Sequence, residues 1–521
     1  MDPSRRSLVT GSAVLAAAPL LPVRNVLDFG AIPDGAGLST LAIQKSIDAA
    51  EHAGGGVAYI PPGRYVTGTI RLKSNVTLHL EAGATIEGSR DKADYSQGCL
   101  VYAENAPNAA IRGRGVIDGS GTSFFVRKDG RWTVGPWRPS RMMQFVQCEN
   151  LLIEDVTLRN SPAWTVHPVD CDRVNIRGVS ILNGIYGEDG PNTDGINPDG
   201  CSRVRISDCY VQTGDDCIVL KCTRRPGRSG VRACRDVTVT NCVLITTETA
   251  LKIGSETYGE FRNITFSNCA IRDGGCGIGL WMRDGGVIDG WTVSNISMTL
   301  SSGGTPVYIW AYPRSRLPED GMAPDEERPP GVVRNVMISG VSAEGDGGIF
   351  ITGLEEKHIE GVTLDNIRMH MRGSREKPMH ADPPYPFRVW GHRQAPYDIF
   401  CRYVDDLTLR GIRFTWGSPE KAEWGSAIRC RHVRDLEIDG FVGRQAKGSE
   451  APAISLSSVK NAFIHDCRAP EGAGVFVGFG QGSERLTLMN NDLAAAAAMV
   501  EVAPGVSRSE VHEAGNRAPR G

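Results

Sequence analysis

Four aspartates in a short span are the residues best placed to do chemistry. Asp194 and Asp199 closely follow Asn192, and Asp215 and Asp216 are adjacent farther along the chain. Two ionised carboxylates held close together raise each other's pKa. Neighbouring carboxyl groups, at least one of them protonated, are the groups that hydrolyse glycosidic bonds. Asn, Asp and Gly also dominate turns, so each motif taken alone favours a plain turn, and the surrounding elements must decide.

The segments that carry these acids belong to a repeat. Each unit reads apolar, polar, apolar, polar, then Asn, Asp or Gly, then apolar, with a period of about 23 to 33 residues and two longer steps. Clear units are 151–156, 174–179, 204–209, 237–242 and 264–269, and later ones continue to 486–492. One unit cannot bury its inward face alone, so the units must stack as coils. The Asn, Asp or Gly position suits a corner in left-handed backbone.

Stacked coils of this kind form a parallel β-helix. We therefore predict an all-β fold, a single-stranded parallel β-helix built from one chain. The alternative is a β-propeller, but its blades need a longer, more regular period and repeated hairpin signals.

A short amphipathic helix is predicted over residues 41–50, where apolar residues recur at helical spacing. Gly54 to Gly56 ends this helix, and strands follow at 57–60 and 76–80. The helix should cap the first coil and cover its open sheet edge. No linker interrupts the repeat, so residues 23–521 are predicted to form one domain, with loop insertions near 312–330 and 372–400.

The first 22 residues read as an export signal. Arg5 and Arg6 precede an apolar run from Val9 to Leu21, the pattern of a twin-arginine signal peptide. The run is too short for a stable membrane span. We therefore expect an exported protein, periplasmic or extracellular, with no membrane span.

Charge and cysteine usage narrow the function further. The net charge of −3 and the pI of about 6.4, with no long basic run, argue against a nucleic-acid partner. Of the fourteen cysteines, six recur at matching places in the repeat, so stacked small side chains explain them better than disulfides; these are Cys148, Cys171, Cys201, Cys234, Cys242 and Cys269. No paired motif has zinc spacing, and we predict neither a metal nor a cofactor.

Alignment of successive coils brings the acids together. Matching residues 217–220 with 250–253 puts Asp215 and Asp216 beside Glu248 and Thr249, with Asp194 one coil earlier. Paired strands lie about 5 Å apart, so these side chains should form one outer patch. Acids stacked on an inert surface would only repel one another, which favours a functional site.

The chain resembles glycoside hydrolase family 28, the group of polygalacturonases and rhamnogalacturonan hydrolases. The motifs behind the resemblance are Asn192-Thr193-Asp194, Gly214-Asp215-Asp216-Cys217, Ile253-Gly254-Ser255, Asp28-Phe29-Gly30-Ala31 and the run 161–168. They cover the chain from about Val26 to at least Ile367.

The resemblance implies a right-handed, pectin-lyase-like β-helix that hydrolyses pectic poly- or oligosaccharides with inversion. By this resemblance Asp215 is the general acid that protonates the leaving glycosidic oxygen. Asp194 and Asp216 hold and deprotonate the attacking water, and Asn192 orients the site by hydrogen bonding. An inverting site needs its carboxyl groups about 6.5–9.5 Å apart. Neighbouring carboxylates should raise the pKa of Asp215 and keep it protonated.

This chain departs from the polygalacturonase pattern in two coils. Glu248-Thr249-Ala250 stands where polygalacturonases carry Gly-His-Gly. Polygalacturonases carry Arg-Ile-Lys one coil later. In one alignment of this chain, Trp281 stands in place of that Arg and Arg283 in place of that Lys. In an alignment shifted by two residues, neither cation has a counterpart. These departures favour a branched or rhamnose-containing pectic substrate, because rhamnogalacturonan hydrolases also lack that histidine.

The same coils supply candidate substrate-binding residues. Lys252 either contacts a substrate carboxylate or pairs with Glu248, and Trp281 either stacks on a sugar ring or packs between coils. The predicted substrate-binding residues are Asn192, Glu248, Thr249, Lys252, Trp281 and Arg283.

Two other functions remain open on the same fold. A polysaccharide lyase would remove a proton next to a uronate with an Arg or Lys base, and the aspartates would hold Ca²⁺. A non-catalytic carbohydrate-binding β-helix would bind without turnover. In each case we expect a monomer.

Overall fold

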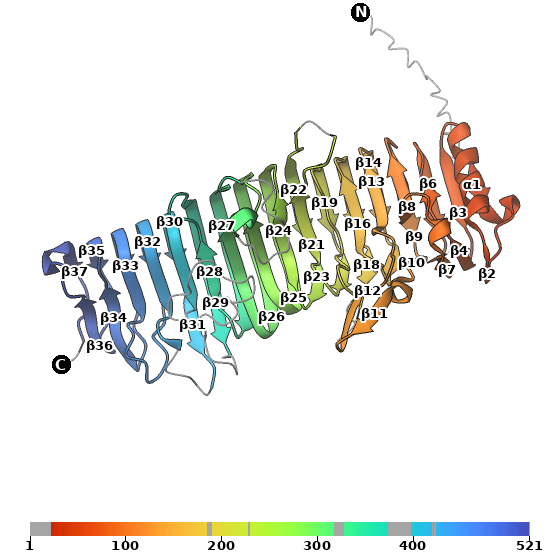
Figure 1. Ribbon diagram of the computed structural model, residues 1–521. Coiled ribbons are helices and arrows are strands. Elements are labelled where there is room, and N and C mark those ends of the chain that lie inside the picture. Colours follow the sequence, from red (N-terminus) through yellow and green to blue (C-terminus); the bar gives the residue numbers. More distant parts are fainter. Residues whose placement is uncertain are drawn as a thin grey trace, which may run out of the picture.

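The chain winds into an elongated stack of coils (Figure 1). The computed structural model describes residues 22–184, 190–227, 230–316, 328–372, 398–418, 420 and 424–519. The predicted signal at 1–22 lies outside this range except for Pro22, and so does most of the predicted insertions at 312–330 and 372–400. The described coils share one hydrophobic core cluster that runs from Val26 to Ala496.

The repeat units are strands that pair in parallel from coil to coil. Leu151 pairs with Val174, Val174 with Val204, and Val204 with Val237. This is the register that the repeat predicts, and the prediction of a parallel β-helix is confirmed. The strands of this sheet include β14 (Glu149–Glu154), β17 (Asp172–Arg177), β19 (Ser202–Ser207) and β22 (Cys234–Thr240).

A second run of parallel strands carries the acids. It contains β13 (Arg141–Val146), β16 (Trp164–Val169), β21 (Ile218–Cys222) and β24 (Thr249–Thr257), and continues into the long strands β25 (Glu260–Met282) and β26 (Val287–Ala311). One antiparallel hairpin, β11 (Phe125–Lys128) with β12 (Arg131–Val134), projects from the stack.

The Asn and Asp positions of the repeat are left-handed corners, as predicted. Asp155, Asp208, Asn241 and Asn268 have φ angles of 60°, 58°, 57° and 52°. Asn and Asp tolerate this region because their short polar side chains bond locally. The Nδ2 atom of Asn241, for example, donates to Oδ1 of Asp208 in the preceding coil at 3.3 Å.

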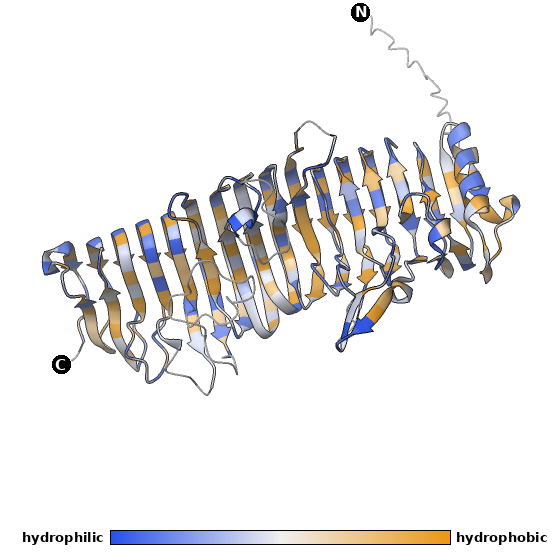
Figure 2. Ribbon diagram, viewed as in Figure 1, coloured by the Kyte–Doolittle hydropathy of each residue, from blue (hydrophilic) through white to orange (hydrophobic). Residues whose placement is uncertain are grey.

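The interior of the described stack is mainly apolar, and apolar and polar residues alternate along the strands (Figure 2). All fourteen cysteines are free and buried, which confirms their interpretation as interior side chains. In the described part of the chain, no helix is long and apolar enough to cross a membrane.

The predicted cap is the helix α1 (Thr40–His52), which closes the N-terminal end of the stack (Figure 1). Its residues Ile43, Ile47 and Ala50 are fully buried. The helix packs against β1 (Val23–Asn25) and β3 (Gly56–Ile60), so it shields the first coil as expected.

Candidate active site

Three of the four aspartates meet at one end of the acid-bearing strands. Ile196 pairs with Ile218, and Ile218 pairs with Leu251. Asp194 and Asp216 each lie two residues before the first two of these positions, so they are lateral neighbours. One carboxylate oxygen from each of Asp194, Asp215 and Asp216 lies within 4.8 Å of the others. The predicted match of 217–220 with 250–253 is confirmed. The carboxylate cluster itself comes from the pairing of Ile196 with Ile218, which sets the coil of Asp194 beside the coil of Asp215 and Asp216.

Burial changes the acidity of two members of this cluster. Asp194 is 3% exposed, and Nδ2 of Asn197 donates to its Oδ2 at 2.8 Å. Burial, and then the charge of Asp215, raises the pKa of Asp194 well above its ordinary value. Burial, and then the charge of Asp216, raises the pKa of Asp215 from 3.8 to about 6. The expected direction for Asp215 is therefore present, but burial contributes more than the neighbouring carboxylates.

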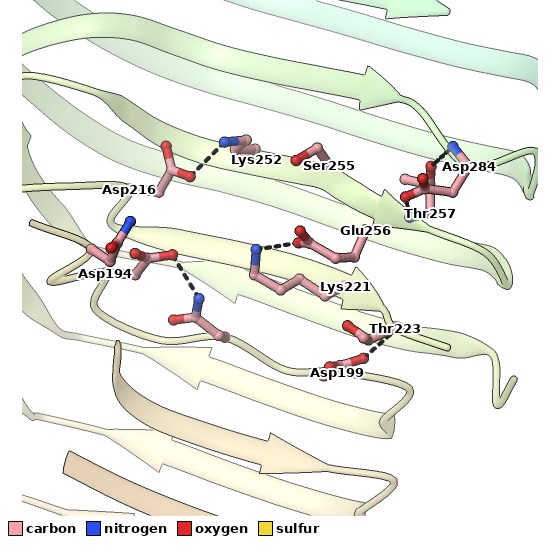
Figure 3. Close-up of polar contacts among 12 residues, drawn as sticks. Asp194, Asp199, Asp216, Lys221, Thr223, Lys252, Ser255, Glu256, Thr257 and Asp284 are labelled. Carbon is pink, nitrogen blue, oxygen red and sulfur yellow. Dashed lines mark hydrogen bonds and ion pairs between the residues drawn. The ribbon is translucent and has the colours of Figure 1, made fainter. Parts of the chain in front are cut away.

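Asp216 is held by the next coil. Nζ of Lys252 lies 2.6 Å from Oδ2 of Asp216 (Figure 3). The backbone N–H of Thr249 donates to Oδ1 of Asp216 at 3.0 Å. Burial alone would lower the pKa of Lys252, but the charges of Asp216 and Asp215 raise it above its ordinary value. Lys252 is therefore an ammonium group that neutralises one member of the cluster.

Asn192 touches the cluster from the opposite side. Its Nδ2 is 3.5 Å from Oδ2 of Asp215, and its Oδ1 accepts from the Arg138 guanidinium at 2.9 Å. The side chain of Arg138 also donates to the carbonyl of Pro162 at 3.0 Å. Asn192 thus links the guanidinium group of Arg138 to Asp215, a position from which it could orient the Asp215 carboxyl group.

The remaining predicted residues lie in the next two coils. Thr249 is buried and meets Asp216 through its backbone, while Glu248 is half-buried just before it. Trp281 and Arg283 are each 3% exposed. Lys252 Nζ lies 4.5 Å from the centre of the Trp281 ring, whereas the Arg283 guanidinium lies 4.9 Å from the ring of Trp310. Lys252 pairs across the sheet with Gly279, not with Trp281 or Arg283.

Asp199 is separate from the cluster. It lies toward the other end of the strands (Figure 3), where His167 Nε2 is 3.4 Å from its Oδ2 and the Thr223 N–H donates to its Oδ1 at 2.8 Å. Arg225 pairs with Asp199 at 2.6 Å. Burial lowers the pKa of His167 to about 4. These contacts make Asp199 a structural anchor.

Sequence reasoning missed an ion pair beside the cluster, between the buried Lys221 and the half-buried Glu256. Lys221 Nζ lies 2.7 Å from Oε2 of Glu256, and Figure 3 shows the pair between the acid cluster and Asp199. Lys221 also lies 4.4 Å from the centre of the Trp164 ring. Burial would lower the pKa of Lys221, but Glu256 and Asp194 raise it. The partners are far apart in sequence, so only the coil alignment could have suggested them.

Two arginines were also missed. Arg138 and Arg141 come from the segment that enters β13, well before the acids in sequence. Arg141 lies over the Trp164 ring at 3.7 Å, and its Nε donates to Nδ1 of His167 at 3.1 Å. Burial lowers the pKa of both guanidinium groups. Within the described residues neither arginine has a carboxylate within ion-pair distance, so both add positive charge to the site.

The cluster has a second chemical capacity. Three carboxylate oxygens within 4.8 Å of one another can ligate a hard cation such as Ca²⁺. Lys252 already neutralises Asp216, which lowers the negative charge that a cation would meet.

Comparison with known proteins agrees with this geometry. The family model for glycosyl hydrolases family 28 matches residues 58–379, more than half of the chain. A probable polygalacturonase of Vitis vinifera is 34% identical over 221 residues, which cover 38% of this chain and 44% of the relative. The match therefore spans less than half the length of that relative.

Two solved structures resemble the fold. The hyperthermoactive exopolygalacturonase of Thermotoga maritima matches with a TM-score of 0.58 and 27% identity, over 69% of this chain and 89% of that one. The family 28 exopolygalacturonase of Yersinia enterocolitica matches with a TM-score of 0.59 and 20% identity, over 81% and 79%. Both likenesses agree with a right-handed parallel β-helix, which is the fold of this chain. The chain belongs to glycosyl hydrolases family 28.

Proposed function

We propose that this protein is a glycoside hydrolase that cleaves pectic poly- or oligosaccharides of the galacturonan or rhamnogalacturonan type. The observation that carries the proposal is the cluster of Asp194, Asp215 and Asp216 in a chain of family 28. Similar proteins are named polygalacturonases and exopolygalacturonases, which supports a pectic substrate.

Asp215 is the general acid of the proposed reaction. Its pKa of about 6 leaves it protonated in weakly acidic solution, where it can give its proton to the leaving glycosidic oxygen. Asp216, paired with Lys252, serves as a carboxylate that accepts a proton from the attacking water. Asp194 holds the same water from the neighbouring coil.

The spacing of the acids bears on the stereochemistry. The nearest oxygens lie within 4.8 Å, below the 6.5–9.5 Å range typical of inverting sites. The distance between nearest oxygens is a lower bound on the separation of the carboxyl groups. We propose that the reaction inverts the configuration of the anomeric carbon, as the family implies, and the anomer of the first product tests this separately.

The charge around the cluster suits an acidic sugar. Arg138 and Arg141 have no carboxylate partner within the described coils, and guanidinium groups bind carboxylates in a planar, two-pronged way. Lys252 adds a third cation. A uronate carboxylate can therefore be held without disturbing the ion pair of Lys221.

Export and assembly are part of the proposal. The signal predicted at 1–22 would deliver the enzyme to the periplasm or the medium, where pectic polymers are met. We propose that it works there as a monomer. N-terminal sequencing of the exported protein and its mass in solution test both points.

The direct test is product analysis on homogalacturonan and rhamnogalacturonan with wild type and Asp215→Asn. Loss of a general acid should reduce turnover by about 10²- to 10⁴-fold. Asp208→Asn is the matched control, because Asp208 is an exposed corner residue at which Asn is also tolerated. Wild-type turnover in Asp215→Asn would remove Asp215 from the mechanism.

The same assay separates the alternatives. A lyase, which the cation-binding capacity of the cluster would favour, gives unsaturated products and loses activity with a chelator. A non-catalytic binding protein shows no turnover, and its affinity for pectic oligosaccharide survives Asp215→Asn.

A further inference from the structure

Lys252 lies close to several carboxylates of the active site. It pairs with Asp216 at 2.6 Å, but other carboxylates also lie close enough to influence it. The charged groups that act on Lys252 or lie on its own coil are Asp194, Asp215, Asp216, Lys221, Glu248 and Glu256. A lysine has a flexible four-carbon stem, so its ammonium could reach more than one of these carboxylates unless neighbouring side chains hold it in place.

The indole of Trp281 occupies the space beside that ammonium. Nζ of Lys252 lies 4.5 Å from the centre of the ring, within the range of a cation–π interaction. Trp281 is 3% exposed and also packs against Tyr308 at a centroid distance of 5.1 Å. Among the described residues, the indole N–H has no hydrogen-bond partner, so packing and the contact with Lys252 set the position of the ring.

Gly279 makes room for this arrangement. It is the residue directly opposite Lys252 in the next coil, and Trp281 follows two residues later on the same face. A Cβ at position 279 would overlap the indole atom Cζ3 and would lie 2.9 Å from Cγ2 of Thr249. The ring therefore lies across the glycine, and any side chain there would displace it.

We propose that Trp281, seated on Gly279, is a positioning residue that holds Lys252 against Asp216. The ring face attracts the ammonium and keeps water away from one side of it, which strengthens the ion pair on the other side. With the ring removed, the ammonium is free to sample the neighbouring carboxylates. This inference rests on the proposed function, in which Asp216 accepts the proton of the attacking water and Asp215 donates its proton to the leaving oxygen. An ammonium held against Asp216 keeps these two roles apart.

The position of Lys252 can be measured without any substrate. Limited acylation with a succinimidyl ester, followed by peptide mass spectrometry, reports how accessible each lysine is. Lys221 provides an internal reference, since it has its own aromatic neighbour, Trp164, and its own partner, Glu256. The ratio of the Lys252 rate to the Lys221 rate therefore separates a local change from general unfolding.

We expect this ratio to rise on the order of tenfold in Trp281→Leu, the size of a partly buried cation–π interaction. Gly279→Ala should give a similar rise although the indole is still present, because the new methyl group displaces it. Trp281→Phe keeps an aromatic face and should stay within about threefold of wild type. Phe350→Leu is the matched control, since Phe350 stacks on Tyr308 at 5.3 Å in the same aromatic cluster.

An unchanged ratio in both Trp281→Leu and Gly279→Ala would overturn the inference. A similar rise in Phe350→Leu would overturn it too, because it would trace the effect to general loosening of the cluster. The pH profile of pectic hydrolysis adds a functional readout, with the basic limb shifted in Trp281→Leu and restored in Trp281→Phe. If wild type hydrolyses no pectic substrate, the proposed function fails, while the acylation ratio still decides the role of Trp281.

Discussion

Burial of Asp215 should cost stability at neutral pH, and replacement by Asn should recover it. The pKa of this carboxyl rises from 3.8 to about 6 on folding, so the folded state holds the proton more tightly than the unfolded chain. The contribution of Asp215 is therefore most favourable below pH 3.8 and is lost as the pH rises to about 6.

The size of the effect follows from linkage. With these two pKa values, ionisation of Asp215 destabilises the fold by about 1 kcal/mol at pH 4.5 and about 3 kcal/mol at pH 7.5. Asn does not titrate and has nearly the same shape. Asp215→Asn should thus gain about 2 kcal/mol over wild type between pH 4.5 and pH 7.5.

Urea denaturation of both proteins at these two pH values measures the change. Asp208→Asn serves as the control, because its exposed corner carboxyl should show no such gain. The wild-type pH profile of kcat/KM reports the same group independently, with a basic limb centred near pH 6 if Asp215 must be protonated. A stability gain that is equal at both pH values, together with a basic limb well away from pH 6, would refute the account of Asp215.

Three further outcomes are expected. Proton NMR of the first product formed should show the inverted anomer, and a retained anomer would mean that a carboxylate attacks the sugar directly. Lys252→Met should move the basic limb of kcat/KM to higher pH, because the charge of Lys252 lowers the pKa of Asp215; a shift to lower pH would contradict this. Lys221→Met should destabilise the protein to urea by about 1.5–3 kcal/mol, since it removes the partner of Glu256 at 2.7 Å and leaves that partly exposed carboxylate with Arg314 at 3.8 Å. The double change Lys221→Met with Glu256→Gln should recover part of that loss, and no recovery would show that the pair is not coupled.

The coil-to-coil register was open to prediction because it depends on a local pattern. Alternation of apolar and polar residues sets which side chains point inward, and stacking then forces equivalent positions to lie side by side. This is why aligning the coil that begins at Ile196 with the coil that begins at Ile218 brings Asp194, Asp215 and Asp216 together. The corners at Asp208 and Asn241 and the buried cysteines follow from the same repeat.

The partners and burial of each polar side chain were decided only by the tertiary structure. The alignment put Lys252 beside Glu248 as well as the aspartates, and the structure pairs it with Asp216. Trp281 had two equal interpretations, and the small size of Gly279 lets its ring fold down beside Lys252.

Contacts between residues far apart in sequence could not be predicted from the repeat either. Arg138 reaches Asn192, and through it Asp215, from a segment far away in sequence. The raised pKa of Asp215 depends first on burial, which is the sum of everything packed around it. Sequence alone thus determined the coils and the line of acids along them, since both arise from a short repeated pattern. The folded structure decided which acid pairs with Lys252 and which acids have a raised pKa, since those properties depend on side chains that only folding brings together.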